Sequence, residues 1–259
     1  ECPSAIIKLE KDGNVPALVP GGDDFCLRCG HCVAVCPHGA LSHAEVPLAD
    51  CSPIQKDLSI TQDQAGQFLR SRRSVRIFKD KLVDQASLTH LIKIARYAPS
   101  ASNSQLVEWI VHTDKDTIHG FAGAAIDWMK QYLEKDPKAK SFPYLPLLVA
   151  AWGAGFDAVL RDAPALIVAS ASREASNGLV DVTLALSYLD LAAPTLGLGT
   201  CWAGLLQGAI LSNPSLKSDI GIPESHPYHY PMMIGYSKAK YFRLPERKEP
   251  KMRFNPGRS

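Results

Sequence analysis

The chain has 259 residues, of which 46% are hydrophobic and 21% are charged, values typical of globular proteins that exclude a disordered or collagen-like chain. The formal net charge of +2 gives no indication of a nucleic-acid or anionic membrane partner. A chain of this length can bury a sizeable core without disulfide bonds, so its seven cysteines need another explanation. Five of them precede Cys51.

The composition of the chain changes near residue 55. Residues 1–55 are rich in Cys, Gly, Pro and His, whereas residues 56–259 carry longer helical and strand patterns, which predicts two domains with those bounds. The residues after Glu1 form no apolar leader, and thiols at metal-ligand spacing are typical of a reducing compartment. We therefore expect a cytoplasmic protein that binds neither a membrane nor a nucleic acid.

Four cysteines near the N-terminus follow the spacing C-x-x-C-x-x-C-x-x-x-C-P: they are Cys26, Cys29, Cys32 and Cys36. This run is typical of bacterial [4Fe–4S] proteins, in which the fourth cysteine ligates the other cluster of a pair. Zinc sites more often use two separated pairs of ligands, which makes a zinc knuckle the less favoured alternative. The spacing therefore predicts an iron–sulfur cluster.

The sequence that follows Cys2 resembles the sequence that follows Cys36, because both are Cys-Pro steps leading to small and then apolar residues. If Cys2 ends an earlier copy of the motif, it is the fourth ligand of the cluster held by Cys26, Cys29 and Cys32. Cys36 would then ligate a second cluster, whose other three thiolates would lie upstream of Glu1. A single cluster remains the alternative.

The second domain begins with two helix-start signals. Thr61 and Gln64 form a possible capping box, and Asp84 can cap a second helix that ends before Pro99. Apolar and β-forming runs predict strands over residues 106–113, 165–171 and 231–236. Two more helices are predicted over residues 118–133 and 179–193. This mixture predicts an α+β or α/β layered domain.

Two further stretches are distinctive. Residues 191–216 carry no charge, but they include Pro194 and several glycines, whereas a membrane-spanning helix needs about 20 predominantly apolar residues. A buried helix and turn is therefore the better interpretation. Residues 238–259 are expected to form an extended basic tail.

Residues 70–81 hold six basic residues and one acid, and the alternation of Arg and Ser in this run suits a phosphate. Together with the segments RRSVRIF, APSASNSQ and LGLGTCWAG, the run resembles the nitroreductase family of FMN flavoproteins. With the cysteine-rich segment in front, the whole chain resembles a ferredoxin-domain–nitroreductase fusion. The resemblance implies a small ferredoxin-like domain followed by an α+β sandwich, with a mixed sheet flanked by helices, in an interlocked homodimer.

The resemblance also implies FMN as a cofactor and indicates the residues that bind it. The first motif places Arg72, Ser74 and Arg76 on the phosphate and ribityl chain, with Arg73 beside the ring. The second motif is the segment that family dimers contribute across the interface to the flavin, namely Pro99, Ser100, Ala101, Asn103 and Gln105. The third motif forms the turn beneath the isoalloxazine ring, with Gly197, Gly199 and Thr200. In the tail, Arg247 matches the basic residue that binds the phosphate, and Arg243 is a second candidate.

These expectations combine into an oxidoreductase that passes electrons from a [4Fe–4S] module to FMN and on to a nitroaromatic, quinone or similar organic acceptor. The donor is expected to be ferredoxin or flavodoxin, with NAD(P)H as the alternative, and no side chain needs to act as an acid–base catalyst. The alternatives are an ene-reductase, a dehalogenase and a non-enzymatic electron relay. Residues 121–162, which are rich in aromatic side chains, are expected to cover the flavin and to set substrate choice.

Several other motifs are interpreted as structural. The segment 153–158 fits G-x-G-x-x-A, but no strand–helix alternation follows it, which argues against a dinucleotide site. Cys201 is expected to be a buried thiol rather than a nucleophile. His226 and His229 have metal-like spacing, but neighbouring prolines favour a loop. Cys51 has no assigned role.

Overall fold

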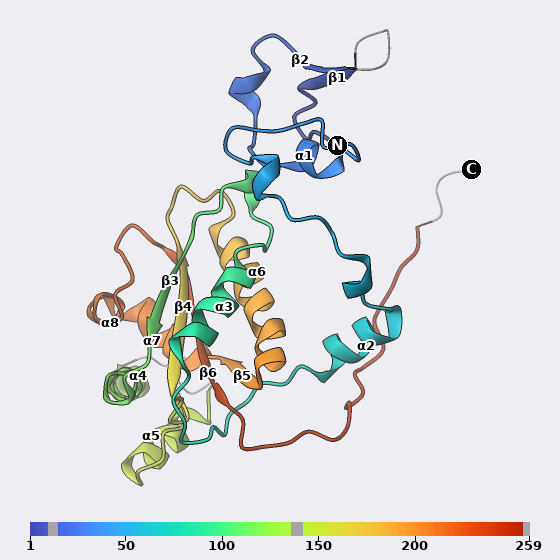
Figure 1. Cartoon of the computed structure of the whole chain (residues 1–259). Coiled ribbons are helices and arrows are strands. Elements are labelled where there is room, and N and C mark those ends of the chain that lie inside the picture. The colour runs from blue at the N-terminus through green and yellow to red at the C-terminus, as the bar shows by residue number, and fades with distance from the viewer. Residues whose placement is uncertain (10–14, 136–141, 256–259) are drawn as a thin grey trace.

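The computed structural model describes residues 1–9, 15–135 and 142–255 (Figure 1). In the figure the N-terminal segment lies above the upper ends of α3, β3 and α6, and the rest of the chain forms a sheet with helices on both faces. This arrangement confirms the α+β expectation.

The N-terminal segment contains little regular structure. Strands β1 (Ile7–Leu9) and β2 (Pro16–Leu18) pair as an antiparallel hairpin. The cysteine run spans the short helix α1 (His31–Val35), and the N-cap residue that precedes this helix, Gly30, has a φ of 69°. Glycine adopts this left-handed conformation at low cost, and it lets the chain turn between two cysteines. Short 3₁₀ turns follow at Leu48–Asp50 and Lys56–Leu58.

Four strands form the main sheet, in the order β3 (Val107–His112), β4 (Ala165–Ala171), β6 (Tyr228–Tyr236) and β5 (Leu198–Trp202). Each neighbouring pair is antiparallel, and a parallel bridge joins Ser74 to Thr200 at the edge of β5. All seven residues of β4 are buried. Because side chains alternate along a strand, β4 contributes to the two apolar cores on opposite faces of the sheet.

Helices cover both faces of the sheet. The core on one face includes residues from α3 (Gln85–Ala95) and α6 (Gly178–Ala192). The other core includes residues from α4, α5, α7 and α8, which span Lys115–Lys135, Leu145–Gly153, Gly204–Ser212 and Pro214–Asp219. Helix α2 (Gln62–Ser71) contains no buried residue, and in Figure 1 it stands apart from the sheet beside the C-terminal tail.

The local signals in the sequence locate most of these elements. The capping box at Thr61 is present, since its hydroxyl accepts from the Gln64 N–H and its own N–H donates to the Gln64 side chain. Asp84 caps α3 as predicted. The strand predicted over residues 165–171 is confirmed at both ends, and β6 begins three residues before the predicted start. The described part of the tail, residues 238–255, contains neither helix nor strand; residues 256–259 lie outside the described residues.

One expectation is wrong. The uncharged stretch 191–216 is not only a helix and turn, because it contains strand β5, which pairs with β6. The expected flavin cover, residues 121–162, stays a prediction; it begins within α4, which buries Phe121, Ile126 and Met129 in the core. Residues 136–141 of that expected cover lie outside the described residues.

Among the described residues, one stretch is long and apolar enough to cross a membrane, namely Gly178–Leu196. Its helix α6 packs against α3, β4 and β6 and carries two buried aspartates, Asp181 and Asp190. These contacts identify α6 as a core helix of the sandwich.

Candidate functional site

Four of the N-terminal cysteines line one cavity of about 490 Å³: Cys2, Cys26, Cys29 and Cys32. All four are partly exposed, unpaired thiols. Cys36 is not among the residues that line this cavity. Four cysteines that line one cavity match the ligand set of a [4Fe–4S] cluster, so the donor chemistry of this cavity fits that group.

The two Cys-Pro steps share a local backbone structure. The third residue after each cysteine has a left-handed conformation, with φ 52° at Ala5 and 60° at Gly39. The backbone N–H four residues after each cysteine lowers the pKa of the Cys2 and Cys36 thiols. At the second step this is a hydrogen bond of 3.2 Å from the Ala40 N–H to the Cys36 sulfur. The repeat read from the sequence is therefore also a repeat in structure.

His43 contacts the sulfur of Cys26. Its Nε2 lies 3.6 Å from the Sγ, and its Nδ1 accepts a 3.0 Å hydrogen bond from the backbone N–H of Glu45. In a neutral imidazole, a ring nitrogen that accepts leaves the proton on the other nitrogen, so Nε2 donates to the sulfur. The sequence analysis missed His43, because a separation of 17 residues carries no motif signal.

A second candidate site is a cavity of about 440 Å³ between the end of α2 and the C-terminal tail. Four arginines line it, namely Arg70, Arg72, Arg73 and Arg247. Glu246 also lines the cavity and pairs with Arg70 at 3.1 Å. Even with Glu246 beside Arg70 and Asp190 beside Arg72, the four arginines leave an excess of positive charge that suits a phosphate.

Arg72 is positioned by a buried carboxylate. Its guanidinium lies 3.5 Å from Asp190, which also accepts a hydrogen bond from the Thr200 hydroxyl. The carbonyl of Thr200 accepts from the Val75 N–H at 2.8 Å. A Cβ on Gly199 would lie 2.3 Å from a methyl carbon of Val75, so this glycine makes room for that side chain. Gly199 thus has a packing role that does not depend on any ligand.

The other arginines predicted to bind FMN do not all line this cavity. Arg73 donates to the carbonyls of Arg70 and Arg72, both at 2.7 Å, and to the carbonyl of Arg243 at 3.5 Å. Arg76 donates to the Ser74 carbonyl at 3.4 Å, and its side chain lines a different cavity of about 790 Å³. The structure therefore does not bring Arg76 into the cavity that Arg72 lines. Gly197 forms the left-handed turn before β5, with φ 71°.

The loop of residues 98–105 is held in a strained conformation. Ser102, Asn103 and Gln105 have φ values of 53°, 55° and 52°, and such values cost energy in residues that carry a Cβ. The Gln105 N–H donates to the Ser100 hydroxyl at 3.0 Å. This loop follows α3, which ends at Ala95.

Buried polar atoms lie beneath the same loop. Asp181, near the start of α6, is buried, and its Oδ1 accepts from the Ala101 N–H at 3.0 Å. Its Oδ2 and the hydroxyl of Ser104 are buried and have no partner among the described residues. Because buried polar atoms are normally paired, these two mark a place where another group can complete the structure.

Asn103 connects this loop to the cysteine-rich segment. Its side-chain amide donates to the carbonyls of Leu27 and Arg28 at 3.1 and 3.2 Å. A cavity of about 1160 Å³ lies between the two segments and is lined by Cys26 and Cys29 on one side and by the loop on the other. The predicted role of Asn103 was a contribution to a flavin, whereas its amide faces the cysteine loop.

The predicted flavin residues fall into two groups at opposite ends of α6 (Figure 1). The loop 98–105 contacts Asp181, and Arg72 and Thr200 contact Asp190. These aspartates are nine residues apart, which at the rise of an α-helix is about 14 Å.

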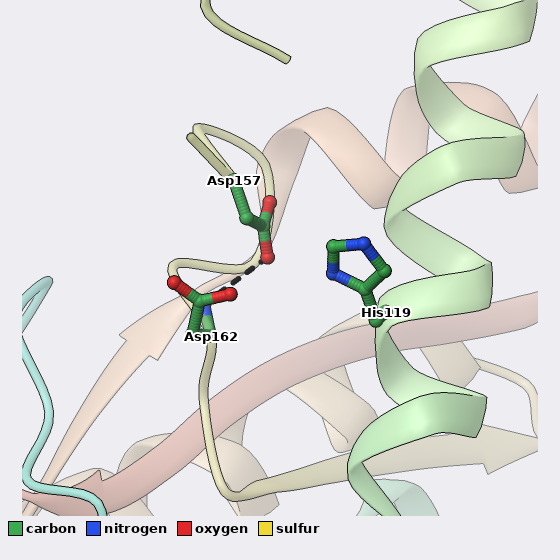
Figure 2. Close-up of side chains that lie close together, drawn as sticks. All are labelled: His119, Asp157 and Asp162. Carbon is green, nitrogen blue, oxygen red and sulfur yellow. Dashed lines mark hydrogen bonds between the residues drawn. The ribbon is translucent and has the colours of Figure 1, made fainter. Parts of the chain in front are cut away.

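A third cluster joins His119 on α4 to Asp157 and Asp162, as Figure 2 shows. Both oxygens of the Asp157 carboxylate take part in hydrogen bonds within the loop. They accept from the backbone N–H groups of Val159, Leu160 and Asp162 at 2.8, 2.8 and 3.1 Å. These bonds cap the turn after α5. We assign the cluster to loop structure.

The remaining motifs are structural. Cys201 is buried as expected, and burial raises the pKa of its thiol. His226 lies in a turn as expected, but His229 lies on β6, where burial lowers its pKa to about 4. Gly153 ends α5 with no dinucleotide loop around it, and Cys51 donates to the Pro47 carbonyl.

Comparison with known proteins agrees with this architecture. The nitroreductase family model matches residues 69–236. The chain belongs to the nitroreductase family. A 4Fe-4S binding domain model also matches residues 23–42. The resemblance read from the motifs is thus confirmed, and the chain is a nitroreductase-family oxidoreductase with a 4Fe-4S motif.

One relative is a protein of Archaeoglobus fulgidus whose name describes an NADH dehydrogenase/NAD(P)H nitroreductase. It is 26% identical over 197 residues, which cover 74% of this chain and 94% of the relative. A nitroreductase with bound FMN from Bacteroides fragilis has a TM-score of 0.61 at 18% identity, covering 74% of this chain and 99% of that one. A nitroreductase with bound FMN from Desulfitobacterium hafniense gives 0.59 at 20% identity, with the same coverage. These structures confirm the nitroreductase fold.

Proposed function

We propose that this chain is an iron–sulfur flavoprotein oxidoreductase that takes up electrons singly at a [4Fe–4S] cluster, passes them to FMN and reduces a nitroaromatic, quinone or similar organic acceptor. The observation that carries the proposal is the pair of hydrogen bonds from Asn103 to the backbone between Cys26 and Cys29. These bonds hold the cysteine loop against the segment that the family resemblance assigns to flavin binding.

The cluster would be held by the four thiols of one cavity, namely Cys2, Cys26, Cys29 and Cys32. Cys36 shares the local structure of Cys2 but lies outside that lining. It therefore stays available as a ligand of a second cluster. The domain bounds, residues 1–55 and 56–259, belong to the same proposal.

The phosphate of FMN would be held by Arg72, Arg73 and Arg247, with Arg70 added by the structure. Asp190 keeps Arg72 oriented toward this site. When bound, FMN supplies the exchange between one-electron and two-electron chemistry. The relatives with bound FMN support this cofactor.

The complete site would need a second copy of the chain. One face of α6 is uncharged and is not covered by the sheet. Its exposed residues are Leu179, Val180, Thr183 and Tyr188, and its half-buried residues are Leu184, Ser187 and Leu191. A twofold axis makes the same surface meet itself, and an axis perpendicular to α6 would pack two such faces with their helices antiparallel. The Asp181 end of one α6 would then lie beside the Asp190 end of the partner's α6. A homodimer therefore joins the two groups of flavin residues that a single chain keeps about 14 Å apart.

The test is anaerobic reduction by alternative donors. Reduced ferredoxin should bleach the flavin absorbance of the wild-type protein and fail to do so in Cys29→Ala, which lacks a cluster ligand. Light-driven reduction of the flavin should work in both proteins and serves as the control. Bleaching by NADH or NADPH at equal rates in both proteins would show that a nicotinamide is the donor and would contradict the proposed relay.

The acceptor is identified by offering nitroarenes, quinones, enones and haloaromatics to the photoreduced protein. We expect nitroarenes or quinones to reoxidise it fastest. Faster reoxidation by enones or haloaromatics would instead indicate an ene-reductase or a dehalogenase. Reoxidation by none of the four would indicate a non-enzymatic electron relay.

A further inference from the structure

We propose that the cluster of each subunit delivers its electrons to the flavin whose phosphate is held by the other subunit. This inference rests on the function proposed above and adds a route to it, since that function does not specify whether electrons stay within one chain. The path of the electrons depends on which end of α6 the cysteine loop contacts.

The cysteine loop is fixed at one end of the molecule. Asn103 binds the carbonyls of Leu27 and Arg28, and the loop that carries Asn103 is in turn bound to Asp181 through the Ala101 N–H. The cluster cavity is thereby tied to the N-terminal end of α6. The cavity lined by the four arginines draws its described lining from residues 69–73 and 245–247, with no residue of the cysteine-rich segment.

The arginine cavity is tied to the other end of the same helix. Arg72 is bound to Asp190, near the C-terminal end of α6, and Thr200 is bound to the same carboxylate. Asp181 and Asp190 are separated by about 14 Å along the helix. Within one chain, the cluster and the phosphate site therefore lie at opposite ends of α6, as Figure 1 shows for the two ends of that helix.

Antiparallel pairing of two α6 helices would bring the cluster cavity of one chain close to the phosphate site of the other. The middle of the uncharged face of α6 lies between Leu184 and Ser187, and a twofold axis perpendicular to the helix there would place the Asp181 end of one helix against the Asp190 end of the other. The cysteine loop of one subunit then lies next to the arginine-held flavin of the partner. Because electron transfer slows steeply with distance, the partner's flavin is the one that the cluster reduces.

The electron balance of this route is simple. A one-electron donor of the ferredoxin type reduces the cluster, and the cluster is oxidised again when it passes that electron across the interface. Two such transfers, together with two protons from water, convert one oxidised FMN into its fully reduced form. The organic acceptor then removes the two electrons.

Crossed heterodimers test the route. In the first heterodimer, one subunit carries Cys29→Ala and the other carries Arg72→Ala with Arg247→Ala, so that one chain lacks a cluster and the other lacks the phosphate site. In the second heterodimer, all three substitutions are in one chain and its partner is wild type. Two different affinity tags allow each heterodimer to be isolated after coexpression.

Both heterodimers contain one intact cluster set and one intact phosphate site, so both should contain half the iron and half the FMN of the wild-type dimer. The readout is the anaerobic bleaching of flavin by reduced ferredoxin in a single turnover. Transfer between subunits predicts fast bleaching in the first heterodimer and bleaching at least 100-fold slower in the second. The reverse result would show that electrons stay within one chain and would overturn the proposal.

A failure of the proposed function gives a different result. In that case ferredoxin would not bleach the flavin of the wild-type homodimer, although iron and FMN were both present. The comparison of the two heterodimers, made after the wild-type measurement, therefore separates the route from the function. Light-driven bleaching of the remaining flavin should be equal in both heterodimers and shows that each flavin site is intact.

Discussion

At the scale of single residues, the hydrogen bond from His43 to Cys26 bears on the electronic properties of the proposed cluster. Hydrogen bonds to the ligand sulfurs are one determinant of the reduction potential of iron–sulfur clusters. A donated hydrogen bond stabilises the more negative, reduced state. We therefore expect His43→Ala to lower the midpoint potential in an anaerobic redox titration followed by electron paramagnetic resonance. His38→Ala changes an exposed histidine of the same segment and should leave the potential unchanged.

The arginine cavity gives a second residue-scale prediction. Arg247 lines the cavity, whereas Arg243 is not among its lining residues and only accepts a hydrogen bond from Arg73 through its backbone carbonyl. Loss of a hydrogen bond to a charged group costs about 1.5–3 kcal/mol, so Arg247→Ala should weaken FMN binding about 10- to 100-fold. Arg243→Ala should have little effect when affinities are measured by fluorescence titration. If Arg247→Ala weakened riboflavin binding equally, the arginine would not be acting on the phosphate.

His229 predicts how stability depends on pH. Burial, together with the charge of Lys217, lowers its pKa to about 4, below the ordinary value of 6.5. The unfolded chain therefore binds this proton first, and the stability of the folded chain falls as pH decreases from 6.5 toward 4. Between pH 7.5 and pH 5 this amounts to about 2 kcal/mol, at about 1.4 kcal/mol per pH unit below 6.5.

The measurement is anaerobic urea unfolding at those two pH values. In His229→Gln the free energy of unfolding should change less between pH 7.5 and pH 5 than in the wild type, because the titrating group is absent. Gln can still donate to the side chain of Gln207, as His229 does in the folded chain. An equal loss of stability in both proteins would assign the acid sensitivity to other groups.

At the scale of elements, the exposed face of α6 carries the prediction of the dimer. Val180 lies on this uncharged face, near the start of α6, and is 55% exposed. We expect Val180→Glu to produce monomers in analytical ultracentrifugation and to reduce the bound FMN, because a charge would be buried between the two helices. Leu211→Glu places the same side chain on α7, at a leucine that is 67% exposed, and should leave a flavin-containing dimer. A dimeric, FMN-replete Val180→Glu protein would exclude α6 as the interface.

The elements also show how far sequence reasoning reaches. The boundaries of β4 were predicted because a continuous apolar run is a local signal, and the Thr61 capping box is equally local. Strand β5 was missed because LGTCW is short and contains Gly199, and it is a strand through pairing with β6 and with Ser74, which are distant in the sequence.

For the candidate sites too, local patterns could be recognised in the sequence and contacts between distant residues could not. The cysteine spacing is a local pattern, so the cluster ligands could be proposed from the sequence. Asp190 and Arg72 are 118 positions apart, and no short motif connects them. A signal was nevertheless present, since Asp181 and Asp190 are the acidic residues of an otherwise uncharged helix, and buried carboxylates need partners. Arg70 belonged to the basic run, but its place in the arginine cavity could not be predicted, because residues 245–247 of the tail form the other side of that cavity.

At the scale of the whole molecule, the two cofactor sites should respond differently to dissociation. The cluster cavity is built from residues 2–45 of one chain, whereas the proposed flavin site takes one group of residues from each of two chains. A ligand that binds only the dimer stabilises it by mass action, by about 2.7 kcal/mol at a free concentration 100 times its dissociation constant. FMN should therefore shift the equilibrium between monomer and dimer toward the dimer, and the cluster should not.

Sedimentation of the protein diluted anaerobically, with and without added FMN, measures this coupling. We expect the dissociated protein to lose its FMN while it retains the same iron content per chain, and added FMN to restore the dimer. Riboflavin should restore the dimer less well than FMN, because it lacks the phosphate that the arginine cavity would bind. Monomers that keep stoichiometric FMN would show that one chain forms the whole flavin site, and the interface would then have no part in binding it.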